Sequence, residues 1–570
     1  MSRTKALPRF RFSVVVIALL LVTSALLARA VYLQVWHAEY LKNQGSSRHL
    51  RIVMDAPNRG MILDRNGEPL AVSTPVESIW AQPQILFEAK EKWPELSRKI
   101  GMKHSQLVKL VSANKHREFI YLKRQVSPEF ARSVMSLDIP GVALRREYRR
   151  YYPAGEAAAH VVGFTNVDDR GQEGIELAYN DWLMGSPGSK RVLKDRLGNV
   201  VETVESISLP ERGQNLILSI DRRIQYLAYR ELKKAVNQHD AKGGTAVVMD
   251  ARTGEVLAMV SQPGFNPNNR SNLKVSHIRN RAVTDLFEPG STLKPFTIAA
   301  ALESGNYSTH SLINTSPGRV RVGQKIIRDK HNYGWLSLAR IIEKSSNVGA
   351  AKVALQLGKQ PLWNMLTRMG FGENTQSGLP GESSGLLNPP SQWARVDQAT
   401  VSFGYGISVT SLQLVRAYAA IANNGVLVTP TLIRTDKPET GDRVLSPEVV
   451  HQLRYMLERA VGKNGTGHAA DIAHYRVAGK TGTVHKLIDG RYDENRYVGL
   501  FAGMVPASDP RLVMVVTIDD PRRGGYFGGQ IAAPVFRRVM SGALRLLDIP
   551  PDHPEKPARQ LVRTEIGRAA

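Results

Sequence analysis

The stretch Phe287-Glu288-Pro289-Gly290-Ser291-Thr292-Leu293-Lys294 places a Pro-Gly turn just before an apolar segment that runs from Phe296 to Glu303. A turn followed by such a segment predicts a helix with Ser291 in its first turn, where free backbone N–H groups and the helix dipole favour negative charge. Lys294 follows three residues later, so its amine lies on the same face as the Ser291 hydroxyl. Pro295 deletes a helical hydrogen bond to the Ser291 carbonyl, which we interpret as a broken local rule at a functional site.

A serine hydroxyl is a weak nucleophile at neutral pH, and a lysine can act as its base where burial lowers the pKa of the amine. The spacing alone does not select Ser291, because Ser112 and Ser271 are also followed by a lysine three residues later. Neither of those serines follows a Pro-Gly turn into an apolar helix. The sequence therefore predicts Ser291 as a nucleophile and Lys294 as its base.

Two further polar elements follow along the chain. Ser345-Ser346-Asn347 lies between a helical segment and an apolar run, and Lys480-Thr481-Gly482-Thr483 lies just before a region of predicted strands. Taken singly, the first fits an ordinary polar loop and the second an ordinary strand with a glycine. In this order after Ser291 and Lys294, they match the three-part signature of penicillin-binding proteins and class A β-lactamases.

On these residues the chain resembles a class B penicillin-binding protein, and among these the FtsI-type peptidoglycan D,D-transpeptidases. The resemblance extends over four more stretches, namely Arg59–Ala71, Tyr152–Gly185, Ser402–Thr410 and Gly524–Gly529. Two positions depart from the family pattern: many FtsI-type proteins have serine at Thr481 and arginine at His485. These departures leave open whether the chain is the main division enzyme or a specialised paralogue.

The resemblance implies a role for each matching residue. Ser291 would attack the D-Ala-D-Ala carbonyl of a stem peptide, with Lys294 as base and the backbone N–H groups of Ser291 and Thr483 as oxyanion hole. Ser345 and Lys480 would relay a proton to the leaving amine, and Asn347 would bind Lys294 or the substrate amide. The hydroxyls of Thr481 and Thr483, with the charge of Lys480, would hold the terminal carboxylate, and Gly482 would let the substrate backbone approach that strand closely.

Three aromatic residues, Tyr497, Tyr526 and Phe527, would form a wall beside the cleft, although ordinary core packing is the alternative. A second stem peptide would resolve the acyl-enzyme into a crosslink, and β-lactam antibiotics would leave Ser291 stably acylated. This chemistry needs no cofactor and no metal.

The fold class predicted is mixed α/β. Residues 244–250, 255–260, 496–506 and 512–518 have the pattern of buried strands, with helices such as 412–423 between them. The family implies a β-lactamase-like transpeptidase domain, with an antiparallel sheet flanked by helices, behind an elongated pedestal. We expect a cytoplasmic tail (1–11), a transmembrane anchor (12–36), a pedestal or dimerisation module (39–213), a transpeptidase domain (214–549) and a disordered tail (550–570).

The amino terminus predicts the compartment. Basic residues up to Arg11 precede an uncharged run, Phe12–Ala28, that spans about 26 Å as a helix, and apolar residues continue to Trp36. The positive flank favours a cytoplasmic amino terminus and places the remainder in the periplasm, in a single-pass protein of the bacterial inner membrane. The alternative is a cleaved signal peptide, since Ala28-Arg29-Ala30 resembles a cleavage site, but the arginine and the apolar continuation favour a retained anchor.

Composition narrows the classes of function. The absence of cysteine excludes a disulfide framework, a thiolate nucleophile and a Cys-based metal site. The net charge of +25 fits anionic lipid or an acidic polymer, and without a recognisable motif we do not expect nucleic acid as a partner. Expected partners are division-complex membrane proteins, including a lipid-linked glycan polymerase. The alternatives are an elongation-type transpeptidase, a β-lactamase, a bifunctional synthase and a mainly structural scaffold.

Overall fold

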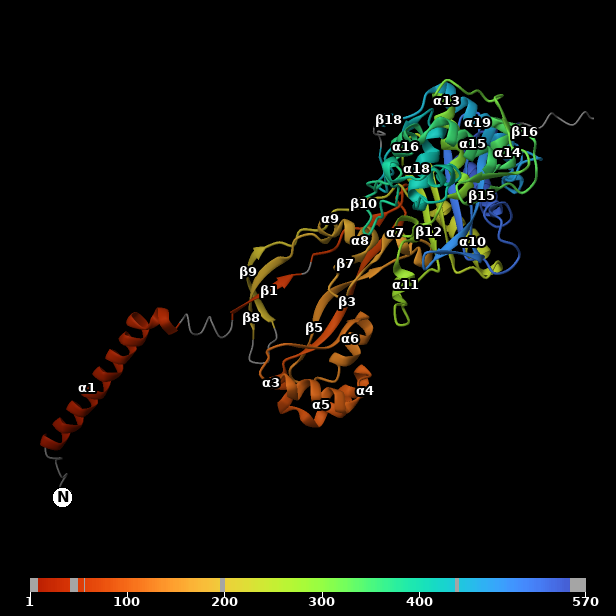
Figure 1. The fold of residues 1–570 in the computed structure, drawn as a ribbon. Helices are drawn as coiled ribbons and strands as arrows, with labels where there is room; N and C mark the ends of the chain where they lie inside the picture. Colours follow the sequence, from red (N-terminus) through yellow and green to blue (C-terminus); the bar gives the residue numbers. More distant parts are fainter. Residues whose placement is uncertain (1–8, 42–49, 56, 195–199, 436–439, 554–570) are drawn as a thin grey trace, which may run out of the picture. The chain divides into compact units, whose positions relative to one another are not determined.

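The computed structural model (Figure 1) describes residues 9–41, 50–55, 57–194, 200–435 and 440–553. The predicted tails therefore lie largely outside the described residues, at 1–8 and 554–570. The chain forms two compact units: the first draws on residues up to Asn58, Pro75–Arg149 and Gly185–Arg212, and the second on Arg59–Thr74, Arg150–Met184 and residues from Gly213 onward. The predicted domain boundaries at 39–213 and 214–549 stay predictions.

A long apolar helix opens the described chain. Helix α1 (Arg9–Val31) continues into a π-helical turn, η1 (Tyr32–Trp36). The span Phe10–Trp36 has 27 residues, and its most apolar 18-residue window has a mean hydropathy of 2.5 and is not buried at all. A helix of about 20 apolar residues suffices to cross a bilayer. Among the described residues it is the one helix with this length and composition, which fits a single-pass membrane anchor.

The first unit is built from strands and short helices. One antiparallel sheet has the order β1-β8-β9, and part of β3 pairs with β4 and β5. Its hydrophobic core includes Ile79, Trp93, Leu107 and Leu122, contributed by these strands and by the helices between them. The bounds are β1 (Leu50–Asp55), β3 (Pro69–Ala81), α3 (Pro83–Glu88), α4 (Trp93–Ile100), α5 (His104–Ala113), β4 (Ile120–Val126), α6 (Pro128–Met135), β5 (Val142–Tyr151), β8 (Gly188–Lys194) and β9 (Val200–Ser208).

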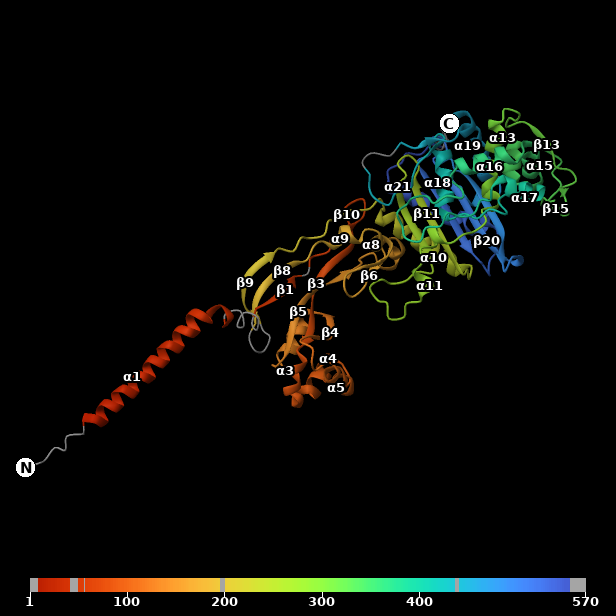
Figure 2. The same cartoon turned by 60° about the vertical axis from the view of Figure 1, so that its left-hand side comes forward.

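The second unit is organised around a five-stranded antiparallel sheet, of which Figure 2 labels β11 and β20. Its strand order is β12-β11-β21-β20-β19. Successive side chains alternate between two cores: Val247 and Met249 of β11 face one, and Ala246 and Val248 face the other. This period of two with both faces buried explains why the strands read as continuous apolar runs. The bounds are β11 (Gly243–Asp250), β12 (Val256–Gln262), β19 (Ala478–Ile488), β20 (Arg491–Val505) and β21 (Leu512–Asp519).

Helices cover both faces of this sheet, as the mixed α/β prediction required. One face packs against α10 (Arg222–Gln238) and α21 (Ala533–Leu546), and the other against α18 (Ser411–Ala422), with α13 (Lys294–Glu303) in the same hydrophobic core as α18. Asp221 caps α10, because its carboxylate accepts a hydrogen bond from Arg223 N at the start of the helix. A short strand, β10 (Leu216–Ile217), precedes α10.

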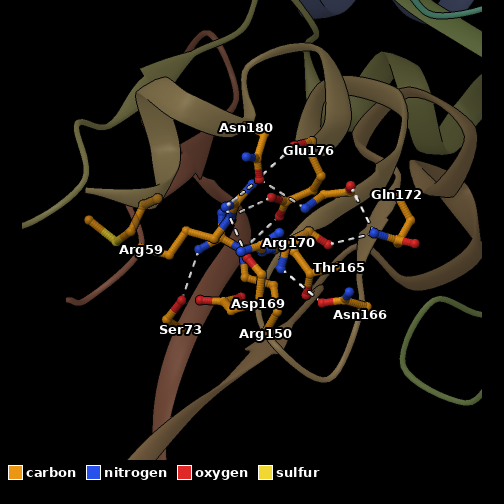
Figure 3. A network of polar contacts seen from close by, with 12 residues as sticks. Arg59, Ser73, Arg150, Thr165, Asn166, Asp169, Arg170, Gln172, Glu176 and Asn180 are labelled. Carbon is orange, nitrogen blue, oxygen red and sulfur yellow. Dashed lines mark hydrogen bonds and ion pairs between the residues drawn. The ribbon is translucent and has the colours of Figure 1, made fainter. Parts of the chain in front are cut away.

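A buried ionic cluster joins early segments of the second unit (Figure 3). The Glu176 carboxylate, on α8 (Gly174–Ala178), accepts from Arg59 Nε at 2.7 Å and from Arg150 Nε at 2.6 Å. Arg150 also donates to Ser73 Oγ, and Arg59 to Asn180 Oδ1. All three ionic side chains are essentially inaccessible to solvent. The cluster therefore brings together the two early stretches, Arg59–Ala71 and Tyr152–Gly185, that resemble the family.

Candidate active site

Ser291 lies in a 3-10 turn, η4 (Gly290–Leu293), that leads directly into α13. The predicted helix start is therefore confirmed, with a tighter first turn. Our interpretation of Pro295 as a broken rule is wrong: Pro295 occupies the first turn of α13, where a backbone N–H needs no helical partner, and Lys294 N instead bonds to the Ser291 carbonyl. The turn is possible because Gly290 has a φ of +53°, which favours glycine.

Lys294 extends from the first turn of α13 into a fully buried position. Its Nζ lies 2.9 Å from Ser291 Oγ, 2.6 Å from the Ser345 carbonyl oxygen, 3.2 Å from Ser345 Oγ and 2.8 Å from Asn347 Oδ1. The two elements Ser291–Lys294 and Ser345–Asn347, which are distant in the sequence, thus meet at a single amine.

The turn that carries Ser345 and Asn347 joins two helices, α14 (Leu338–Lys344) and α15 (Asn347–Leu357). Ser345 ends α14 in the left-handed region with a φ of +59°, and Ser346 caps α15 by accepting from Gly349 N. A non-glycine residue in this region is uncommon and is maintained only by its surroundings.

Asp329 binds the residues that follow Ser345 in this turn, and it was not predicted from the sequence. Its carboxylate accepts hydrogen bonds from Ser346 Oγ at 2.5 Å, Asn347 N at 2.6 Å and Val348 N at 3.0 Å. A carboxylate at the amino end of a helix is favoured by the free N–H groups there. The only available signal was an isolated aspartate shortly before the Ser345 element, in a stretch without periodic pattern.

Lys480 lies inside β19, an additional strand ahead of the strands predicted at 496–506 and 512–518. The apolar run that indicated strands begins only later, at the buried half of β20, because β19 contains lysine, threonine and glycine in place of branched apolar residues. Strand β19 is at the edge of the sheet, and Lys480 Nζ reaches Ser345 Oγ at 3.0 Å. Ser345 Oγ is thereby within hydrogen-bond distance of both lysines.

Burial determines the charge of the two lysines. Desolvation lowers the pKa of Lys294 well below its usual value; the positive charge of Lys480 lowers it further, and Asp329 opposes the shift. Desolvation lowers the pKa of Lys480 to about 7. Both side chains are inaccessible to solvent. A neutral amine beside Ser291 is therefore accessible near neutral pH, as a general base requires.

The other residues of the Lys480–Thr483 element belong to the same edge strand, β19. Thr481 Oγ1 lies 2.7 Å from Thr466 Oγ1, and Thr483 Oγ1 accepts from Gly528 N at 3.0 Å. A Cβ at Gly482 would lie 2.7 Å from the Leu500 side chain and 3.0 Å from the Pro289 carbonyl oxygen. Glycine here thus allows β19 to pack closely against its neighbour strand and the turn before Ser291.

The three predicted aromatic residues form a continuous row beside β19. Tyr497 stacks on Tyr526 with ring centroids 4.0 Å apart, and Tyr526 contacts Phe527 at 4.4 Å. His485 extends the row, with its ring 4.7 Å from Tyr497. Tyr526 and Phe527 are 36% and 41% exposed, so they are not core residues.

Glu288, three residues before Ser291, is a second residue that sequence reasoning missed. Its Oε1 accepts from Gly406 N at 2.7 Å and from the Tyr492 hydroxyl at 2.9 Å. Burial raises the pKa of Glu288, and burial with the charge of Glu288 raises that of Tyr492. The contact fastens the β19–β20 hairpin and the Gly404–Gly406 loop to the turn that presents Ser291.

The other two Ser-x-x-Lys occurrences have no comparable surroundings. Ser112 is an exposed residue of α5, and Ser271 lies in an exposed turn where its hydroxyl bonds to Asn269 Oδ1. The geometry therefore separates Ser291 from both.

Comparisons with known proteins agree with this geometry. Residues 244–541 match the penicillin-binding protein transpeptidase domain, and residues 54–218 match the penicillin-binding protein dimerisation domain. The chain is 43% identical over 549 residues to the peptidoglycan D,D-transpeptidase FtsI of Escherichia coli K12, covering 95% of this chain and 93% of that relative. It is 41% identical to the probable peptidoglycan D,D-transpeptidase PbpC of Pseudomonas aeruginosa, covering 95% and 96%.

A solved structure shows the same likeness in three dimensions. The chain superposes with a TM-score of 0.68 on penicillin-binding protein 3 from Mycobacterium tuberculosis, crystallised with aztreonam, at 28% identity and with 88% of this chain and 98% of that one covered. Both domains and nearly the full length are thus shared with known members. The chain belongs to the penicillin-binding protein family and is a class B member, with a dimerisation domain ahead of its transpeptidase domain.

Proposed function

We propose that this protein is a peptidoglycan D,D-transpeptidase that crosslinks stem peptides through an acyl-enzyme on Ser291. The observation that supports this most directly is the position of the buried Lys294 amine, 2.9 Å from Ser291 Oγ. The names of its relatives, among them the E. coli transpeptidase, agree with this activity.

In the proposed acylation step, Lys294 acts as the base. A neutral lysine has two N–H groups and one lone pair, and the Ser345 carbonyl and Asn347 Oδ1 can only accept hydrogen bonds. Donation to these two acceptors leaves the lone pair directed at the Ser291 hydroxyl. Ser291 Oγ then bonds to the peptide carbonyl carbon while its proton passes to Lys294.

The leaving amine needs a proton when the bond to the terminal D-Ala breaks. Ser345 Oγ is 3.2 Å from Lys294 Nζ and 3.0 Å from Lys480 Nζ, so its hydroxyl can pass on the proton that Lys294 has taken up. Lys480, Thr481 and Thr483 would hold the terminal carboxylate at the edge of β19. The backbone N–H groups of Ser291 and Thr483 would form the oxyanion hole, where one donor typically contributes about 3 kcal/mol.

Deacylation by the amine of a second stem peptide would complete the crosslink. The alternative, hydrolysis as in a β-lactamase, requires a carboxylate that activates water. Asp329, close to the reacting groups, already binds Ser346, Asn347 and Val348 with its two oxygens. Because both Asp329 oxygens already accept hydrogen bonds from the protein, this carboxylate is not available to activate water. This favours transfer to an amine over hydrolysis and supports a long-lived adduct with β-lactams.

The nucleophile is tested by labelling the full-length protein with a fluorescent penicillin. We expect stable labelling of the wild type and none of Ser291→Ala, while Ser112→Ala, the matched control, labels normally. Equal labelling of wild type and Ser291→Ala would contradict the proposal, and rapid turnover of the adduct would favour a β-lactamase.

For the cellular role, we propose septal synthesis at the inner membrane, with the domains after α1 in the periplasm. The basic residues before the apolar helix support this orientation, and the likeness to FtsI supports division. Division-complex membrane proteins, including a lipid-linked glycan polymerase, are the proposed partners. Depletion should give filamentous cells; round cells would favour the elongation-type alternative, and rescue by Ser291→Ala would favour a scaffold.

A further inference from the structure

A pocket of about 650 Å³ lies beside the aromatic row, at the loop that follows β21. It is lined chiefly by Arg496, Tyr497, Asp520, Arg522, Arg523 and Tyr526. The site assigned to the reaction above does not use its three arginines.

The pocket has an excess of positive charge. Arg496 is paired with Asp520, donating from Nη2 at 2.5 Å and from Nε at 3.0 Å. Although burial opposes it, hydrogen bonding with Arg496 holds the pKa of Asp520 below its usual value, so this carboxylate stays ionised and engaged. Arg522 and Arg523 approach Asp520 and Asp240 only at 4.0 Å, beyond hydrogen-bond distance.

The loop that carries the arginines is fixed by its backbone. Arg522 N and Arg523 N both donate to the His239 carbonyl, at 2.8 and 3.0 Å, and Asp520 N donates to the Tyr497 carbonyl at 2.9 Å. Gly524 follows with a φ of +71° and packs against the His239 ring. Because the backbone is already ordered, a ligand would need to order only the two guanidinium side chains.

The same loop leads directly to the catalytic strand. After Tyr526 and Phe527, Gly528 N donates to Thr483 Oγ1 at 3.0 Å. A peptide that lies along the row Tyr497, Tyr526 and Phe527 would therefore extend from the edge of β19 to the arginine pocket. Guanidinium groups bind carboxylates through paired, charge-assisted hydrogen bonds.

We propose that the pocket formed by Arg496, Arg522 and Arg523 binds a carboxylate of the acceptor stem peptide while its amine attacks the acylated Ser291; this rests on the proposed function. The amine nitrogen bonds to the acyl carbon, the bond to Ser291 Oγ breaks, and the proton lost by the amine returns to that oxygen. The donor peptide is covalently held at this stage, and its terminal carboxylate has left with D-Ala. The acceptor peptide is held only by noncovalent contacts. An anion-binding site therefore contributes more to the binding of the acceptor than to that of the donor.

The test measures acyl transfer by the full-length protein in detergent from a small thioester donor. The acceptor is a synthetic lysine-containing stem tetrapeptide, with its carboxylates either free or converted to amides. For Arg522→Gln/Arg523→Gln we expect kcat/KM for the free-carboxylate acceptor to fall roughly tenfold, as for the loss of a charge-assisted hydrogen bond. Transfer to the amidated acceptor should not change.

The matched control is Arg537→Gln/Arg545→Gln, which removes the same charge from exposed positions on α21 and should leave both acceptors unaffected. The rate of penicillin labelling should be the same in all variants, which shows that the fold and the acylation site are intact. Should the double variant fail that check, the single variant Arg523→Gln, at a side chain 79% exposed, repeats the measurement.

Equal loss with the free and amidated acceptors would overturn the proposal, and so would no loss with either. A loss that follows amidation of the donor instead of the acceptor would assign the pocket to the donor peptide and would also overturn it. Failure of the proposed function is a different result: the wild type itself would then form no acyl-enzyme and transfer to no acceptor.

Discussion

Lys480 Nζ lies 3.0 Å from Ser345 Oγ, so a residue of the edge strand and a residue of a helix-ending turn share one hydrogen bond at the centre of the site. The same hydroxyl is 3.2 Å from Lys294 Nζ. Two lysines on either side of one hydroxyl cannot both be charged at low cost in a buried site, because like charges disfavour each other's ionisation. When one of the two amines is protonated, its charge therefore favours the neutral form of the other.

The rate of acylation by penicillin should fall as the pH drops below neutrality. Burial, with the charge of Lys480, lowers the pKa of Lys294 well below its usual value, and that of Lys480 is about 7, so the pair takes up protons on the acid side. Protonated Lys294 cannot accept the Ser291 proton, and the rate should change by about tenfold per pH unit there. In the alkaline range, where an ordinary lysine would titrate, Lys294 is already neutral and should cause no further change in the rate.

The variant Lys480→Gln tests which group causes the acid limb, because it removes the charge that lowers the pKa of Lys294. The acid limb of its residual activity should move to higher pH, whereas Lys463→Gln, at an exposed lysine, should leave the profile in place. The assignment of Lys294 as the base would be refuted if the acid limb of Lys480→Gln lay at the same pH as that of the wild type. It would also be refuted if the acid limb of the wild type lay near the pKa of a free lysine.

Gly404→Ala should slow acylation roughly a hundredfold, as expected when a nucleophile is misplaced. Gly404 has a φ of +84°, and a Cβ there would lie 2.2 to 2.6 Å from backbone atoms of Gly290, directly before Ser291. Gly305→Ala is the matched control: its φ is +73°, but a Cβ would meet nothing within 4 Å. Both variants should lose about 1–2 kcal/mol of stability from the left-handed backbone. Equal acylation rates in the two would show that the Gly404–Gly290 contact does not position Ser291.

The sequence alone predicted those parts of the molecule that leave a local pattern. The turn before Ser291, the spacing to Lys294 and the continuous apolar runs of β11 and β21 are all visible within a few residues. Asp329, Glu288 and Glu176 were missed because each acts through partners far away in the chain, such as Tyr492 for Glu288 and Arg59 for Glu176. The spacing of apolar residues along the chain gives no information on hydrogen bonds between distant residues. Single carboxylates in irregular stretches also resemble surface residues. Strand β19 around Lys480 was not predicted for a related reason, since this edge strand lacks the apolar residues that mark a strand.

Asp329→Asn should lower both stability and acylation. The amide cannot replace a carboxylate that accepts from Ser346, Asn347 and Val348, and loss of such a cap typically costs about 1–2 kcal/mol. Asp329 also raises the pKa of Lys294, so the acid limb of the acylation profile should move to lower pH, opposite to Lys480→Gln. Thermal unfolding and penicillin labelling measure the two effects. Asp509→Asn, at a side chain 77% exposed, is the control; a profile for Asp329→Asn like that of the control would refute the role.

Glu176→Gln should be the most destabilising of these changes, although Glu176 is no part of the reacting cluster. It removes the charge that two buried guanidinium groups share, those of Arg59 and Arg150 (Figure 3). Breaking a buried ion pair from one side typically costs about 3–5 kcal/mol, because the remaining charge loses its compensation. The thermal midpoint of the full-length protein should fall accordingly. Glu205→Gln, which breaks a solvent-exposed pair with Arg191, should cost less than about 1 kcal/mol.

Replacing all three ionic residues together separates compensation from simple loss of contact. The triple variant Arg59→Met/Arg150→Met/Glu176→Leu removes both guanidinium groups together with the carboxylate that they share, and apolar replacement of buried ionic residues is often tolerated. We therefore expect a thermal midpoint above that of Glu176→Gln, even though three residues have changed. A triple variant less stable than Glu176→Gln would show that the directed hydrogen bonds to Ser73 and Asn180, which it also removes, hold these segments together more than charge balance does.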